Sequence, residues 1–217
     1  MFNKLAFVSA LSILFPVAAS FIRYKSLGRD YYLLFIFFFI SFVAEVIGAT
    51  LNIESKNNIW LINIFTLLEC FFWCLVIYQW LASKKIRLFI IFFLAAFFIA
   101  WGYTTFFHLD VYQFNNYIRT AESIVFVFLA CFLLLAVSVD MEHMLFRNPK
   151  FWFGSGLLLY FSVNVIVFST VNFILDNESH LMDNSWVIHS VSNIISNLLF
   201  ATGFLCLKPL TISSSPS

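Results

Sequence analysis

The side chains in this sequence that could do chemistry lie inside long apolar stretches, and the last stretch holds the clearest pattern. Polar residues recur there at i, i+3, i+4, i+7 and i+8, namely His189, Ser192, Asn193, Ser196 and Asn197. This spacing places all five on one face of a helix. A polar face turned towards lipid would leave hydrogen-bonding groups unsatisfied, so we expect it to contact protein or water.

Formal charges also lie within the apolar stretches, although ionisable groups are costly in hydrocarbon and usually face a partner or a wet cavity. They are Glu45, Glu69, Arg119 and Glu122. Together with nearby amides they predict one polar pocket. Its predicted ligand-binding set is Glu45, Asn63, Glu69, Arg119, Glu122, Asn164, His189, Asn193 and Asn197.

A purely structural interpretation fits the same residues. Hydrogen bonds between membrane helices contribute ~0.6 kcal/mol each on average, so these groups would only tie helices together. Arg119 and Glu122, one helical turn apart, would pair with each other. We favour the pocket over this structural interpretation because the polar groups concentrate in one half of the membrane. The other half carries little beyond Ser residues and Gln79.

The composition requires these helices to lie in a membrane. The chain has 217 residues, of which 62% are hydrophobic and only 11% are charged. A soluble domain is ~45–50% apolar and ~25% charged, so this chain lacks the polar residues to cover a water-facing surface. A soluble enzyme is thereby excluded. The net charge of +1 provides no field that would attract nucleic acid.

Seven stretches are long enough to cross ~30 Å of hydrocarbon, which needs ~20 apolar residues. The predicted spans are 5–22, 31–51, 58–82, 88–107, 118–139, 151–175 and 186–207. The sequence therefore predicts an all-α, polytopic membrane protein with one seven-helix domain over 1–217. The tail, 208–217, is too short for an output domain.

Basic residues set the predicted orientation, because cytoplasmic loops are enriched in Lys and Arg. One side holds nine of them: Arg23, Lys25, Arg29, Lys84, Lys85, Arg87, Arg147, Lys150 and Lys208. The other side holds Lys4, Lys56 and Arg119. We therefore expect the N-terminus outside and the C-terminus in the cytoplasm, in a bacterial inner membrane.

Two pairs of spans align without gaps and suggest a 3+1+3 internal repeat. At an offset of 120, Thr50 falls on Thr170, and at an offset of 126, Trp60 falls on Trp186. Chance similarity between Phe-rich helices is the alternative. A 3+1+3 repeat resembles, in architecture alone, the small-sugar and vitamin carriers.

The sequence predicts no catalytic residue, no metal site and no cofactor. His189 is the only histidine inside a span, whereas a zinc-dependent membrane hydrolase needs about three. A retinal pigment needs a lysine in the middle of the last span, and Lys208 lies at its edge. The last outer loop adds only acidic charges, from Asp176, Glu178 and Asp183. An acidic mouth favours cations or protons.

These observations favour a sensor with an outward-facing pocket. We expect it to bind a small cationic ligand or a proton, and to signal through a separate protein partner in the membrane or cytoplasm. Its helix count and orientation resemble those of bacterial seven-helix sensory modules. A small-solute transporter of 3+1+3 architecture is the second interpretation, and an intramembrane lipid hydrolase using two carboxylates is the third.

Overall fold

The structure, a computed structural model, describes residues 4–54, 56–108, 115–140, 144–177 and 179–208, with the backbone alone for 171–177 and 179–184. Helices make up its regular structure. They are α1 (Lys4–Ser12), α2 (Leu14–Ile22), α3 (Arg29–Ile53), α4 (Ile59–Trp80), α5 (Lys84–Tyr103), α6 (Asn116–Asp140), α7 (Pro149–Asn177) and α8 (Ser179–Leu205). A five-residue π-helical segment, Thr104–His108, extends α5. Short 3-10 helices occupy Tyr24–Ser26 and Leu145–Arg147.

Seven helical segments of the described chain are long and apolar enough to cross a membrane. This confirms the all-α prediction and the number of spans, and it fits an integral membrane protein. Several helices extend beyond the predicted spans. For example, α7 reaches Asn177 and α8 begins at Ser179, so little chain separates them.

The helix of the first span is interrupted at Ile13, between α1 and α2, although Ile13 itself keeps a helical backbone conformation. Pro16 explains the break. Proline has no backbone N–H, so it cannot donate to the carbonyl four residues earlier, which belongs to Ser12, and its ring crowds that carbonyl. The Ser12 hydroxyl also donates a hydrogen bond to the Ser9 carbonyl, at 2.6 Å, within the last turn of α1.

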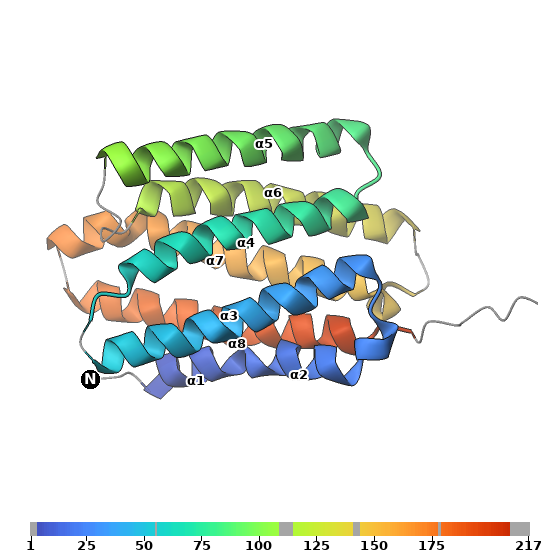
Figure 1. Cartoon of the computed structure of the whole chain (residues 1–217), viewed down its shortest axis with the longest axis horizontal. Coiled ribbons are helices and arrows are strands. Elements are labelled where there is room, and N and C mark those ends of the chain that lie inside the picture. Colours follow the sequence, from blue (N-terminus) through green and yellow to red (C-terminus); the bar gives the residue numbers. More distant parts are fainter. Residues whose placement is uncertain (1–3, 55, 109–114, 141–143, 178, 209–217) are drawn as a thin grey trace, which may run out of the picture.

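Figure 1 shows the helices side by side in one bundle, with the start of α1 at one end and the end of α8 at the other. Helices α6, α7 and α8 pack as successive neighbours, and α1 and α2 pack along α8. Helix α3 joins α2 to α4, and α5 packs on α4 and α6. Only Ile90 and Phe97 of α5 are buried, so this helix has the largest lipid-facing surface.

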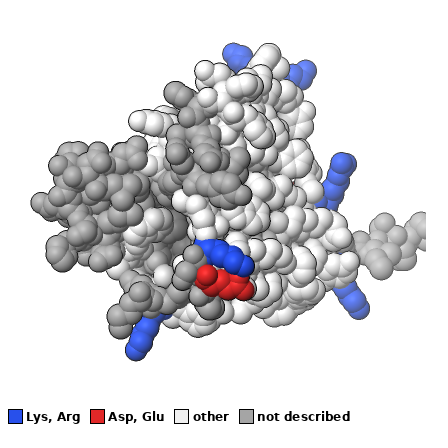
Figure 2. All heavy atoms as spheres, turned by 60° about the vertical axis from the view of Figure 1, so that its left-hand side comes forward, with Lys and Arg blue, Asp and Glu red and all other residues white. Residues whose placement is uncertain are grey.

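We name the two ends of the bundle by their content. The pocket end holds the N-terminus of α1 and the connection between α3 and α4, and the basic end holds the connections between α2 and α3 and between α4 and α5. Among the described residues on the face that Figure 2 turns forward, uncharged surface predominates. At the pocket end, Lys56 and Glu54 form an exposed ion pair at 2.7 Å.

Aromatic rings fill the basic-end half of the bundle. Phe38 of α3 contacts Phe200 and Phe204 of α8, with ring centroids 5.2 and 5.9 Å apart. Phe153 of α7 reaches Phe204 at 5.0 Å, and Trp73 of α4 reaches Phe200 at 5.5 Å. We call these five residues the aromatic core. Edge-to-face and tilted ring contacts of this kind are favourable beyond the area that they bury.

Glycines let α7 and α8 approach closely enough for these rings to pack. A Cβ added at Gly156 would lie 2.6 Å from the Phe200 ring, and one at Gly203 would lie 2.7 Å from the Phe153 ring. Each helix therefore presents a phenylalanine to a glycine on the other. This reciprocal packing is how small residues bring membrane helices together, although the sequence contains no GxxxG motif.

Candidate functional site

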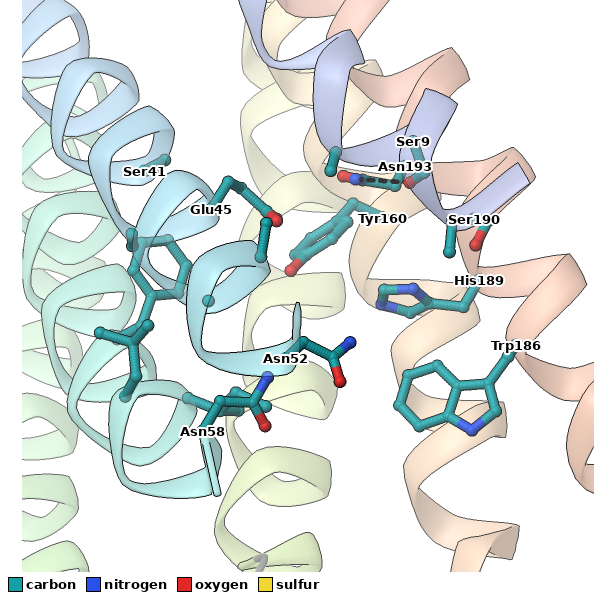
Figure 3. A pocket seen from close by; sticks show the side chains of 18 of the residues that line it. Ser9, Ser41, Glu45, Asn52, Asn58, Tyr160, Trp186, His189, Ser190 and Asn193 are labelled. Carbon is teal, nitrogen blue, oxygen red and sulfur yellow. Dashed lines mark hydrogen bonds between the residues drawn. The ribbon is translucent and has the colours of Figure 1, made fainter. Parts of the chain in front are cut away.

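A cavity of about 360 Å³ lies in the pocket-end half of the bundle. Helices α1, α3, α4, α7 and α8 form its walls, and α6 contributes one residue (Figure 3). The polar side chains of its lining are Ser9, Ser41, Glu45, Asn52, Asn58, Arg119, Tyr160, Trp186, His189, Ser190 and Asn193. The volume lies at the lower end of the ~300–1,000 Å³ typical of small-molecule sites.

Arg119 lines the cavity, but its charge is already neutralised. Its Nη1 donates to Glu69 Oε2 of α4 at 3.1 Å, and both side chains are buried, with residue exposures of 9% and 2%. The guanidinium also lies over the ring of Phe168, 5.1 Å from its centroid, which is a cation–π geometry. A buried pair of this kind holds α4, α6 and α7 in one arrangement.

The expectation that Arg119 pairs with Glu122 is wrong. Arg119 reaches across to Glu69 instead, and both carboxylate oxygens of the fully buried Glu122 lack a hydrogen-bond partner among the described residues. The pairing of two residues one turn apart is worth only a few tenths of a kcal/mol at a helix surface. In a bundle interior, the facing helix determines the partner.

Asn164 of α7 is the other buried amide near this pair. Its side chain is 1% exposed, and neither its oxygen nor its nitrogen has a hydrogen-bond partner among the described residues. Helices α6 and α7 run antiparallel, with Arg119 against Phe168 and Phe126 against Phe161. Glu122 and Asn164 lie between these two contacts, so they occupy the same level of the helix pair.

His189 of α8 is surrounded by aromatic rings. Its ring centroid lies 5.7 Å from that of Trp186, 6.0 Å from that of Phe168 and 6.3 Å from that of Tyr160. Figure 3 shows His189, Tyr160 and Trp186 along one side of the cavity. Tyr160 also adjoins Glu69 and Asn164, so it connects the cavity wall to the buried polar groups behind it.

Two asparagines of α8 fasten α1 to the bundle. Asn193 Nδ2 donates to Ser9 Oγ at 3.0 Å, and Asn197 Nδ2 donates to Ser12 Oγ at 2.7 Å. The residue numbers rise together on both helices, so α1 and α8 are parallel. The second bond meets α1 at the residue where the Pro16 break begins.

Glu45 of α3 contributes the other formal charge of the lining. In Figure 3 its carboxylate points across the cavity towards Tyr160. It has neither a hydrogen-bond nor an ion-pair partner within the described part of the chain. Because Arg119 is paired with Glu69, Glu45 is the one formal charge of the described lining that no protein group balances.

The structure separates the predicted residues into two groups. Those that line the cavity are Glu45, Arg119, His189 and Asn193, and those buried behind or below it are Glu69, Glu122, Asn164 and Asn197. Asn63 is also buried and does not line the cavity, and its backbone carbonyl accepts a hydrogen bond from Trp101 Nε1 of α5. The predicted acidic mouth depends on the side chains of Asp176, Glu178 and Asp183, which lie outside the described residues.

Sequence reasoning missed seven polar lining residues that the structure brings together: Ser9, Ser41, Asn52, Asn58, Tyr160, Trp186 and Ser190. Tyr160 precedes Asn164 by four residues and Trp186 precedes His189 by three, so helical spacing alone could have found both. Ser9 and Ser41 gave no such signal. A serine in an apolar helix usually bonds to its own backbone, as Ser41 does to the Phe37 carbonyl at 2.8 Å.

Similarity to known proteins adds nothing to this geometry: no family model matches the sequence, and neither the curated proteins nor the solved structures include a match. The class of protein therefore follows from the fold and the cavity alone. It is an all-helical bundle with seven segments able to span a membrane and a polar cavity at one end.

Proposed function

We propose that this protein is a membrane sensor that binds a small organic cation in the cavity and signals through a separate protein. The observation that carries the proposal is the unbalanced carboxylate of Glu45. Glu45 is exposed to the cavity within a helix able to span a membrane, and a charge at such a depth is costly unless a positive charge compensates for it. With Arg119 held by Glu69, a positively charged ligand supplies that compensation.

The rings on the opposite wall support a cation of the ammonium type. Trp186 and Tyr160 line the cavity beside His189, on the side that lies across from Glu45. Aromatic faces attract cations through the negative charge of their π surfaces, and quaternary ammonium groups are bound in this way. A carboxylate and several rings together favour an alkylammonium group over a metal ion, which prefers oxygen ligands.

The packing beneath the cavity favours a sensor over the alternative carrier. Phe65 of the cavity wall stacks on Phe37 at 6.1 Å, and Phe37 contacts Trp73 of the aromatic core at 5.6 Å. Apolar rings thus continue from the cavity towards the basic end. A carrier needs polar groups along a path to both surfaces, whereas a sensor needs a closed site and a movable element.

Helix α1 is suited to be that movable element. It is separated from α2 at Ile13, and its side-chain hydrogen bonds to α8 start from Asn193, which itself lines the cavity. A ligand that contacts Asn193 competes with or reinforces the bond to Ser9. Occupancy of the cavity can therefore shift the position of α1 relative to α2, which is the change that a partner would detect.

Binding of tetramethylammonium and choline to the purified protein in lipid nanodiscs tests the proposal. Wild type should bind at least one of them, and Glu45→Gln should weaken that binding by about 30-fold or more, because the remaining site lacks the balancing charge. Glu54→Gln is the matched control, since Glu54 is exposed and paired with Lys56. Absence of binding by wild type, or equal binding by Glu45→Gln, would refute the proposal.

A further inference from the structure

Small residues of α1 and α3 line the cavity on both sides of the space between these two helices: Ala6 and Ala10 of α1, and Ala44 and Gly48 of α3. Helices α1 and α3 do not pack closely on each other. We call the space between these residues the α1–α3 seam. Helix α3 packs along α2 and α4. Its second half and α1 both border the cavity.

The seam lies at the depth of hydrocarbon. Ala10 is six residues inside the span that begins at Lys4, and Ala44 is eight residues inside the end of the span at Asn52. At 1.5 Å per residue these positions are about 9 and 12 Å from the helix ends. The neighbouring side chains on the outside are apolar and exposed, including Phe7 at 52% and Val43 at 41%.

The polar and apolar parts of the lining are on different sides. Arg119, Tyr160 and His189 stand on α6, α7 and α8, and Glu45 reaches towards them from α3 (Figure 3). The remaining lining of α1 and α3 near the seam is mostly small: alanines and Gly48 lie beside Ser9 and Ser41, whose hydroxyls are already hydrogen-bonded to Asn193 and to the Phe37 carbonyl. A ligand that satisfies both sides has a charged head in the cavity and an apolar portion directed outwards between α1 and α3.

Two further observations point to a head group rather than a whole lipid inside the cavity. A volume of about 360 Å³ accommodates a small head and little more. Arg119 also has an Nε–H without a hydrogen-bond partner among the described residues, on a side chain that is nine-tenths buried and lines the cavity. Because neighbouring atoms cover this Nε, a ligand oxygen reaches it only after the Arg119 side chain shifts.

We propose that the ligand is a single-chain cationic amphiphile that enters from the bilayer through the α1–α3 seam and leaves its alkyl chain in the lipid. This inference rests on the proposed cation-binding function and names the class of ligand. It also explains why the cavity is bordered by alanines and a glycine at a depth where larger side chains could have packed.

The experiment compares two probes that share a head group, tetramethylammonium and dodecyltrimethylammonium, on the protein in nanodiscs, with empty nanodiscs subtracted. Gly48→Leu narrows the seam, and it should fold, because a Cβ at Gly48 meets only Leu61, at 3.6 Å. It should weaken binding of dodecyltrimethylammonium about tenfold more than it weakens binding of tetramethylammonium, because a larger side chain between the helices hinders the alkyl chain as well as the head group. Ala10→Leu should do the same from the other helix.

Val46→Phe is the control, because Val46 is 50% exposed on α3 and does not line the cavity. It should leave the binding of both probes unchanged. A photoactivatable group at the end of the alkyl chain should label α1 and α3, at residues such as Phe7 and Val43. Equal effects of Gly48→Leu on the two probes, or labels confined to other helices, would overturn the lateral entry.

The probes also separate this inference from the proposed function. Suppose that wild type binds tetramethylammonium, that Glu45→Gln abolishes this binding, and that the seam variants affect both probes equally. Only the lateral entry is then overturned. If neither probe binds to wild type, the cation-binding function fails, and the lateral entry of a cationic amphiphile fails with it.

Discussion

The two halves of the bundle hold their helices together by different means. Towards the pocket end, single polar contacts join helices that are distant in sequence, as in the pair Arg119–Glu69 at 3.1 Å and the bond from Asn197 to Ser12 at 2.7 Å. Towards the basic end, ring-on-ring and ring-on-glycine contacts replace them, with Phe153 and Phe204 only 5.0 Å apart.

The difference follows from what lipid does as a solvent. Burying an apolar ring inside a membrane bundle gains nothing over leaving it in lipid, so aromatic packing stabilises only by close fit. Polar groups gain more from a partner, yet they need only one or two contacts and tolerate space around them. The tightly fitted half is therefore suited to fixing the fold, and the polar half can keep a cavity.

The largest expected effect is in the polar half. Arg119→Met leaves Glu69 buried without its partner, and removing one member of a buried pair costs about 3–5 kcal/mol. We expect the free energy of unfolding, measured by SDS titration in mixed micelles, to fall by that amount. The double variant Arg119→Met with Glu69→Met should recover most of the loss, because both charges are gone. A double variant as unstable as the single one would show that the pair is not what stabilises this region.

A smaller effect is expected in the aromatic half. Gly203→Ala places a methyl group 2.7 Å from the Phe153 ring, so one helix must shift, at about 1–3 kcal/mol. The free energy of unfolding should fall, whereas cation binding at the distant cavity should be nearly unchanged. Gly102→Ala is the control, because an added Cβ there meets nothing within 4 Å. If Gly203→Ala weakened cation binding as much as it lowered the free energy of unfolding, the two halves of the bundle would not act independently.

The helices were predictable from sequence because they depend on composition over long windows. The span predicted at 31–51 lies inside α3, Arg29–Ile53, and the one at 118–139 lies inside α6, Asn116–Asp140. The break in the first span was also readable, since Pro16 is a known helix breaker, but hydropathy averages over it. The orientation across the membrane and the 3+1+3 repeat stay predictions.

Contacts between helices were less predictable than the helices themselves. Helical periodicity put Asn193 and Asn197 on one face, and it could not reveal that their partners are Ser9 and Ser12, more than 180 residues earlier. The local rule that joins Arg119 to Glu122 failed for the same reason. Spacing along one helix defines a face, whereas the neighbour of that face depends on how all seven segments pack.

The smallest expected effect tests the link between the cavity and α1. Hydrogen bonds between membrane helices average ~0.6 kcal/mol, so a double-mutant cycle of Ser12→Ala and Asn197→Ala should give a coupling energy of that size in the free energy of unfolding. Ser138→Ala is the control, because the Ser138 hydroxyl bonds only within α6, to the Leu134 carbonyl. That variant should show no coupling to Asn197→Ala.

The cycle also shows whether the polar half transmits a signal or only holds α1 in place. If α1 moves when a cation binds, the coupling energy should differ between protein with and without tetramethylammonium, since the bond is made or strained differently in the two states. A spin label at Val8, which is 51% exposed on α1, should report the same movement, and Ser12→Ala should change its extent. Identical coupling energies with and without the cation, together with an unmoved label, would show that the Asn–Ser contacts only hold α1 in place. The sensor would then need a different moving element.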